Sequence, residues 1–213
     1  MDENALRRAV CETGRLLWER GLIAGSDGNL SARLADGAVL LTPSGVSKGG
    51  LTPEALVVLD ADGAPLRGAG KPSSEWRMHL AIYRARPEVG AVVHAHPPCA
   101  TAFAAAGRVL PLLLPEAVLT LRRIGVAPYA LPSSQALADG AAAALADGDA
   151  AILMGHGAVT VAADLGAAWE RMETLEHCAK VALYAQALGG GVPLAEEAVA
   201  ALDALREGRR AAH

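Results

Sequence analysis

Two histidines one residue apart, His94 and His96, are the side chains best suited to chemistry in this chain. They end the apolar run Ala91–Val93, which is typical of a buried strand. Side chains two residues apart on a strand point the same way, so the two imidazoles converge on one place. Imidazole nitrogen is a common ligand of Zn²⁺. The spacing therefore predicts part of a metal site at the end of this strand.

A third histidine, His156, follows a second apolar run, Ala151–Met154. Glycines flank it on both sides and leave room close to the backbone. Three histidine ligands without a cysteine are typical of a catalytic zinc site, in which a fourth position stays open. We therefore predict one Zn²⁺ per chain on His94, His96 and His156, with another divalent transition metal as the alternative.

Glu75 is the candidate general acid or base, because it begins an expected helix that leads, after Pro87, into the His94 strand. A partly desolvated carboxylate beside a divalent ion can bind the ion or move a proton. An acid at a helix start can equally serve only to stabilise the helix, and the spacing does not separate these two roles. His79, one helical turn further, is interpreted as a solvated or core-edge imidazole rather than as a partner of Glu75.

Three polar loops, 26–29, 42–45 and 73–74, have the composition of an anion-binding site. Their hydroxyls, amide and glycine N–H groups suit a phosphate, and the third loop lies at an expected helix N-terminus. Lys48 and Lys71 could add positive charge. Each loop by itself is more typical of an ordinary turn, so only the combination indicates phosphate.

Elements must position these residues. Hydrophobic periodicity predicts helices over about residues 3–20, 75–86, 100–106, 135–145, 165–188 and 194–206, and strands over 30–34, 39–42, 57–60, 91–94 and 151–154. The gaps in the first third are of hairpin length and favour antiparallel pairs, so we expect a mixed sheet. No linker divides the chain, which predicts one α/β domain over residues 1–213 with helices flanking a central sheet.

Composition narrows the possible partners. The chain is 52% hydrophobic and 20% charged, which is typical of a folded globular protein. A net charge of −4 without a basic cluster argues against nucleic acid, and no apolar run is long enough for a membrane span. The N-terminal residues do not resemble a signal peptide, and the three scattered cysteines suggest reduced thiols. We expect a cytoplasmic protein.

Five stretches, in this order and spacing over about residues 3–190, together resemble the class II aldolase and adducin superfamily. They are Gly28-Asn29-Leu30-Ser31-Ala32-Arg33, Thr42-Pro43-Ser44-Gly45, Lys71-Pro72-Ser73-Ser74-Glu75, Val93-His94-Ala95-His96-Pro97 and Gly155-His156-Gly157. The resemblance implies a three-layer α/β/α sandwich with a mixed, largely antiparallel sheet. It also implies a homotetramer with active sites at subunit interfaces.

The resemblance further assigns roles to residues of this chain. Zn²⁺ would lie on the same three histidines, and Glu75 would be the acid or base. The phosphate of a sugar substrate would be bound by Gly28, Asn29, Ser44, Gly45, Ser73 and Ser74.

The reaction that the resemblance implies is aldol cleavage of a small ketose 1-phosphate to dihydroxyacetone phosphate and an aldehyde, through a metal-stabilised enediolate. Sugar-phosphate 4-epimerisation, dehydration of methylthioribulose phosphate and decarboxylation of a 3-oxo-tetronate phosphate would use the same metal and phosphate loops. A non-catalytic adducin-like interaction domain should have lost its metal ligands, whereas this chain retains all three histidines.

One segment departs from the family pattern. Fuculose-type aldolases place a tyrosine, which protonates the aldehyde oxygen, in the stretch matching residues 112–117, where this chain has Leu114-Pro115-Glu116. Glu116 either takes the place of that tyrosine or is a surface acid, and the sequence supports both equally. Tyr129, after Pro128, is a further candidate.

Overall fold

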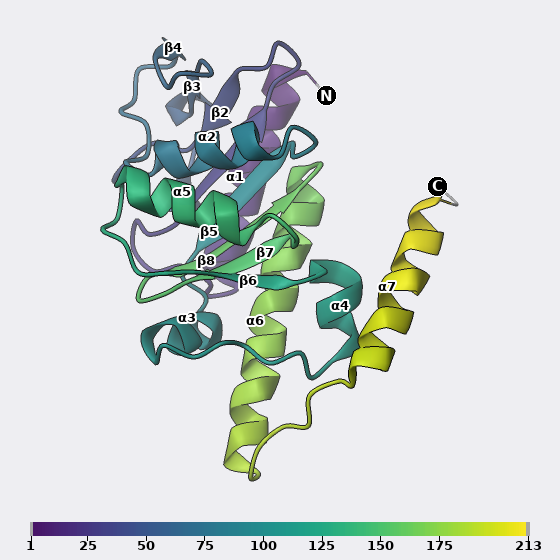
Figure 1. Ribbon diagram of the computed structural model, residues 1–213. Coiled ribbons are helices and arrows are strands. Elements are labelled where there is room, and N and C mark those ends of the chain that lie inside the picture. Colours follow the sequence, from purple (N-terminus) through teal and green to yellow (C-terminus); the bar gives the residue numbers. More distant parts are fainter. Residues whose placement is uncertain (1, 212–213) are drawn as a thin grey trace.

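A central sheet of eight strands organises the computed structural model, which describes residues 2–211 (Figure 1). The expected domain also includes residues 1, 212 and 213, which lie outside the described residues. The strand order is β4-β3-β2-β1-β5-β8-β7-β6. Every neighbouring pair is antiparallel except β6 and β7, so the sheet is mixed and largely antiparallel, as expected. The strands are β1 (Asn29–Arg33), β2 (Val39–Leu41), β3 (Val57–Leu59), β4 (Pro65–Arg67), β5 (Ala91–Ala95), β6 (Ile124–Ala127), β7 (Ala150–Leu153) and β8 (Gly157–Ala162).

Helices cover both faces of the sheet, which confirms the three-layer arrangement (Figure 1). One face carries α1 (Glu3–Glu19), α3 (Pro98–Ala105), α4 (Pro115–Leu121) and the long α6 (Leu165–Ala187). The other carries α2 (Trp76–Ala85) and α5 (Gln135–Ala144), which pack side by side. The last helix, α7 (Glu196–Ala211), packs along α4, and two short 3₁₀ turns span Lys48–Gly50 and Pro53–Ala55.

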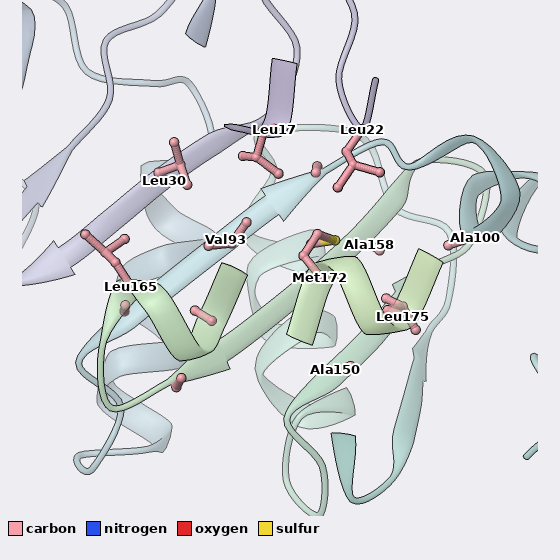
Figure 2. Close-up of a cluster of buried hydrophobic side chains, with 14 of the residues drawn as sticks. Leu17, Leu22, Leu30, Val93, Ala100, Ala150, Ala158, Leu165, Met172 and Leu175 are labelled. Carbon is pink, nitrogen blue, oxygen red and sulfur yellow. The ribbon is translucent and has the colours of Figure 1, made fainter. Parts of the chain in front are cut away.

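The larger apolar core lies between the sheet and the α1 and α6 layer. Figure 2 shows Leu30 and Val93 of the strands facing Leu17 of α1 and Met172 of α6. These side chains are fully buried. Burying one such side chain contributes roughly 1.5–3 kcal/mol, so this layer fixes the sheet on which the polar residues stand.

Alternation along β5 decides which face of the sheet receives the histidines. Ala91, Val93 and Ala95 belong to the core beneath α1 and α6, whereas Val92 belongs to the core beneath α2 and α5. His94 is in step with Val92, so its side chain points to the α2 side. The start of α2, with Glu75, therefore lies on the same face as the histidine.

The structure contains several helices and strands that the sequence did not predict. Strands β4, β6 and β8 and helix α4 were not expected, and the last helix continues to Ala211. β4 and β6 have only three and four residues, and α4 has seven, so none is long enough to show a clear period. β8 follows His156 directly through a tight turn, and the sequence carries no loop of polar residues there.

Among the described residues, no helix has both the length and the apolar character that crossing a membrane requires.

Candidate metal and substrate site

The three predicted histidines meet in one cluster. His94 and His96 come from the end of β5, and His156 comes from the turn between β7 and β8. One nitrogen of each ring lies within 4.8 Å of the others, and the ring centroids are 4.8–5.1 Å apart. Three imidazoles from two segments more than fifty residues apart thus face one point.

The hydrogen bond of His94 fixes which of its nitrogens faces this point. Nδ1 of the fully buried ring lies 2.9 Å from the carbonyl oxygen of Ala158 on β8. A carbonyl only accepts, so Nδ1 carries a proton and Nε2 is the nitrogen turned toward the other two rings. Nε2 faces Nε2 of His96 at 3.3 Å. A ring oriented in this way by a backbone carbonyl is typical of a metal ligand.

The charge states and donors of the cluster fit a divalent cation. Burial, together with the neighbouring His94, lowers the pKa of His156 to about 4 and also lowers the pKa of His96. Both rings are therefore neutral at pH 7, the state that binds metal. Oε1 of Glu75 and Nδ1 of His156 are buried without a hydrogen-bond partner. Neutral imidazoles beside an incompletely bonded carboxylate suit a site for a divalent ion.

Glu75 reaches into the cluster from the residue before α2. Its Oε2 lies 3.2 Å from Nε2 of His94, and its Oε1 lies 3.4 Å from Nε2 of His156. The side chain makes no capping hydrogen bond to α2, so it faces the histidines instead of stabilising the helix start. Burial raises the pKa of Glu75, but His94 and the amide of Asn29 lower it more, and the pKa lies well below the usual range. Glu75 is therefore ionised.

A chain of buried hydrogen bonds holds Glu75 from behind. Nδ2 of Asn29 donates to Oε2 of Glu75 at 2.8 Å, and Oδ1 of Asn29 contacts Nε2 of His79. Ser31 Oγ lies 2.6 Å from Nδ1 of His79 and 2.8 Å from the hydroxyl of Tyr83. The expectation that His79 is a solvated or core-edge imidazole is wrong, because the ring is fully buried in this chain of contacts.

The direction of donation is fixed at every hydrogen bond between Tyr83 and Glu75. The carboxylate of Glu75 accepts from Asn29, so the amide oxygen of Asn29 accepts from His79. His79 is therefore protonated on Nε2, and its Nδ1 accepts from Ser31, which in turn accepts from Tyr83. Burial, with the nearby His94, lowers the pKa of His79 to about 3, so the ring stays neutral, as this arrangement requires.

The predicted phosphate loops and the histidine cluster border one cavity of about 430 Å³. All six predicted loop residues line it, together with Glu75, His96 and His156, while His94 lies buried behind them. The six are Gly28, Asn29, Ser44, Gly45, Ser73 and Ser74. A phosphate held by these loops would therefore leave the rest of a small molecule beside the histidines.

Gly28 permits the first loop to approach the end of β5. Its φ is +72°, and a Cβ at this position would lie 2.8 Å from the carbonyl oxygen of His94. Both the conformation and the contact require glycine.

Lys48 lies in the wall of the cavity but is buried. Its Nζ donates to the carbonyl oxygens of Ser26 and Val46, the latter at 2.9 Å. Burial lowers its pKa. Lys48 therefore links the loop at 26–29 to the residue that follows the loop at 42–45, and it adds positive charge between these two loops. Lys71 is exposed and does not line the cavity.

Two lining residues, Pro132 and Ser133, were not assigned from the sequence, and both come from the segment before α5. Asp27, in the predicted loop 26–29, places Oδ2 3.4 Å from Nδ1 of His96. Ser133 has a φ of +67°, which is uncommon outside glycine. The Leu131-Pro132-Ser133-Ser134 stretch has a loop composition, but nothing in its spacing connects it to the histidines.

The structure does not bring Glu116 to the cavity of its own chain. Glu116 is exposed in the first turn of α4, near Cys178 of α6. Burial and this carboxylate raise the pKa of the Cys178 thiol to about 11. Tyr129 is exposed, with its ring against Gly155 in the turn that carries His156, and it does not line the cavity either.

Comparison with known proteins agrees with this geometry. Residues 8–183 match the family model of the class II aldolase and adducin N-terminal domain. The chain is 38% identical to a 3-oxo-tetronate 4-phosphate decarboxylase from Haemophilus influenzae, over 85% of this chain and 88% of the relative. It is also 38% identical to an L-fuculose phosphate aldolase from Methanococcus maripaludis, over 78% of this chain and 90% of the relative.

A solved structure of L-fuculose 1-phosphate aldolase superposes with a TM-score of 0.91 and 31% identity, covering 95% of this chain and 96% of that one. The family match, the relatives and the shared fold all point the same way: this chain belongs to the class II aldolase and adducin family.

Proposed function

We propose that this protein is a zinc-dependent aldolase that cleaves a small ketose 1-phosphate to dihydroxyacetone phosphate and an aldehyde. The observation that carries the proposal is the arrangement of the three clustered histidines, the ionised buried carboxylate of Glu75 and the predicted phosphate loops around one cavity. His94, His96 and His156 would hold the ion. When bound, the ion acts as a Lewis acid toward the substrate carbonyl, which is what class II aldolases use a divalent metal for.

Glu75 would move the proton. Its carboxylate is ionised and lies within 3.4 Å of two of the proposed ligand nitrogens. It can therefore reach a carbon next to a carbonyl held there, and can take or return a proton at that carbon. Asn29 and His79 keep the carboxylate in place, so its position does not depend on the substrate.

The loops would orient the substrate. The hydroxyls of Ser44, Ser73 and Ser74 and the N–H groups of Gly28 and Gly45 supply donors for a phosphate. Fixing the phosphate restricts the sugar chain to the space between the loops and the histidines, which contributes to rate through orientation.

We propose that the active protein is a homotetramer with its sites at subunit interfaces. Large apolar side chains are exposed where α6 ends, including Tyr184 and Leu188, and a second copy could cover them. Glu116 does not line the cavity of its own chain. As the acid on the aldehyde side, it would have to act in the cavity of a neighbouring subunit. All three cysteines are unpaired, which supports a cytoplasmic location.

Decarboxylation of a 3-oxo sugar-acid phosphate is the second candidate. One observation favours it: the stretch 112–117 has no tyrosine. Loss of CO₂ needs no acid on an aldehyde oxygen, so a site without that tyrosine would still support it. The relative from Haemophilus influenzae is named for this reaction. Epimerisation and dehydration remain compatible with the same residues.

The test is to measure the metal content and the products of one preparation. We expect about one zinc ion per chain by elemental analysis, and none in His94→Ala. The loaded protein is then incubated with a panel of ketulose 1-phosphates and 3-oxo-tetronate 4-phosphate, and product masses distinguish cleavage, epimerisation, dehydration and CO₂ loss. Unchanged metal in His94→Ala would contradict the site, and CO₂ release alone would favour the second candidate.

A further inference from the structure

A second cavity, of about 380 Å³, lies at the other end of the sheet from the histidines. β7 begins just after Asp149, which lines this cavity, and ends just before the turn that carries His156. Residues at the end of β8, at the C-terminal end of α4, on α6 and on α7 complete the walls. The cavity is therefore separated from the proposed active site by the length of a strand.

Arginines dominate this cavity. Four of them line it against two acids, which leaves two positive charges in excess. The four are Arg86, Arg122, Arg171 and Arg206, and the acids are Glu88 and Asp149. The buried carboxylate of Asp149 lies 2.9 Å from Nη2 of Arg86, 3.1 Å from Nη2 of Arg171 and 3.7 Å from Nη1 of Arg122. One carboxylate thus faces three guanidinium groups.

Two of the arginines have a structural role. Arg86 also donates to the carbonyl oxygens of Leu145 and Gly148. Arg171 also donates to the carbonyl oxygens of Thr120 and Val161. These bonds hold the ends of helices and strands around the cavity. Arg86 and Arg171 therefore contribute positive charge, but most of their N–H donors already bond to the protein.

Arg206, on α7, differs from Arg86 and Arg171 because two of its donor nitrogens have no acceptor. Its side chain is only 14% exposed, yet its Nε and Nη1 are buried without a hydrogen-bond partner. The acids nearest to its Nη2, on Asp203 and Glu207, lie at 3.6 and 4.0 Å, beyond ordinary hydrogen-bond distance. A largely buried guanidinium with unsatisfied donors is unfavourable unless an acceptor joins it.

Arg122 lines the same cavity as Arg206. It follows α4 with a φ of +63°, a strained conformation for a residue with a side chain. Arg122 and Arg206 also line a neighbouring cavity that opens toward Gly125 and Asp147, so the two side chains form the wall between the two spaces. An anion at this wall can therefore meet donors from both.

We propose that Arg122 and Arg206 form a binding site for the phosphate group of a phosphate monoester or of free phosphate. Guanidinium groups bind phosphate oxygens through charge-assisted N–H donors, and Arg206 has two buried nitrogens that still lack an acceptor. In Figure 1, α7 lies beside α4, so an anion bound between Arg122, which follows α4, and Arg206 would link α7 to the rest of the fold.

Calorimetric titration with inorganic phosphate tests the site. All proteins carry Ser44→Asp, which places a negative charge in the loops near the histidines and removes phosphate binding there. We expect one phosphate per chain to bind this parent. Arg206→Gln should weaken that binding about tenfold or more, and Arg122→Gln should do the same, because each removes a charge-assisted donor pair. The matched control Arg20→Gln, on the surface at the end of α1, should change it less than about twofold.

Two outcomes would overturn the proposal: a parent that binds no phosphate, or Arg206→Gln and Arg122→Gln proteins that bind it as the parent does. Arg206→Lys, which keeps the charge but loses the paired donors, supplies a folded comparison and should bind with intermediate affinity. Glycerol 1-phosphate, titrated in parallel, distinguishes the sources. Tighter binding than inorganic phosphate indicates a metabolite ester, and equal binding indicates free phosphate.

Discussion

Glu75 is held by two different sets of contacts at the level of single residues. The histidines stand in front of it, with His94 Nε2 at 3.2 Å, and Asn29 donates to it from behind at 2.8 Å. Both favour the ionised carboxylate, which is the form that can accept a proton.

Glu75→Gln should retain the metal and lose turnover. Glutamine has nearly the same shape and its amide oxygen can still accept from Asn29, but it cannot take a proton. We expect kcat to fall by roughly 10²–10⁴-fold, the usual contribution of a positioned acid or base, with unchanged zinc content. Steady-state rates and elemental analysis on one preparation measure both. Glu170→Gln, at an exposed acid on α6, is the control, and a rate within a few-fold of native in Glu75→Gln would exclude Glu75 from this role.

His79 should make stability depend on pH. Its pKa is about 3 in the folded protein and about 6.5 when unfolded. The unfolded chain therefore binds the extra proton first, and stability falls as the pH drops below about 6.5. Between pH 7 and pH 5, one such histidine removes about 2 kcal/mol.

The measurement compares urea unfolding of the native protein and His79→Gln at pH 7 and pH 5. The loss of stability between these two pH values should be about 2 kcal/mol smaller in His79→Gln, since glutamine does not titrate. An equal loss in both proteins would show that His79 is not held neutral in the folded state.

The histidine cluster could be predicted from the sequence, but the buried hydrogen bonds from Asn29 and His79 that hold Glu75 beside it could not. His94 and His96 share a strand face because of the two-residue period, and the glycines around His156 mark the third histidine of the cluster. The contact between Asn29 and His79 joins residues fifty positions apart. No local pattern encodes it, because it depends on the register of β1 against β5 and on where α2 crosses them.

At the level of elements, close packing between β6 and α5 depends on a single glycine. A Cβ at Gly125 would lie 1.8 Å from the carbonyl oxygen of Ala144. Gly140, on α5, has room, with its nearest neighbour at 3.8 Å. The same substitution should thus have opposite effects at these two positions.

Gly125→Ala should destabilise the protein by about 1–3 kcal/mol, because the strand and helix must move apart. Gly140→Ala should stabilise it by up to ~1 kcal/mol, since alanine favours the helix and meets only ordinary contacts. Chemical denaturation of both variants provides the comparison. If Gly125→Ala were as stable as the native protein, β6 would not pack against α5 as described.

The elements that the sequence predicted are those with a clear period or clear punctuation. The helix over 165–188 and the strand over 91–94 were placed within a residue or two, because their apolar patterns are long or bounded by turns. β6 has Gly125 in its middle, and α4 is a short helix between prolines and arginines. Both are stabilised mainly by contacts with neighbouring elements of the fold. Tertiary contacts decide such short segments, and a single sequence does not display them.

At the level of the whole molecule, an interfacial site should show complementation. If Glu116 acts in the cavity of a neighbouring subunit, His94→Ala and Glu116→Gln damage different halves of one site. Mixing the two inactive proteins in equal amounts and reassembling them should restore about one quarter of native activity, because random assortment completes that share of the sites.

Activity of the mixture is measured after mild dissociation and reassembly, with each variant treated alone as the control. No recovery in a mixture that has reassembled to the native size would place both residues in the same subunit's site or remove Glu116 from the reaction.

The outer strands of the sheet bear on how copies of this chain can meet. β4 begins with Pro65 and contains Arg67, and all three of its residues are exposed. At the other border, Pro128 follows β6 and has no N–H to offer a further strand. Short borders that carry proline and charge discourage strand addition and fibre growth. Edge-to-edge joining of sheets from two copies is therefore disfavoured at both borders.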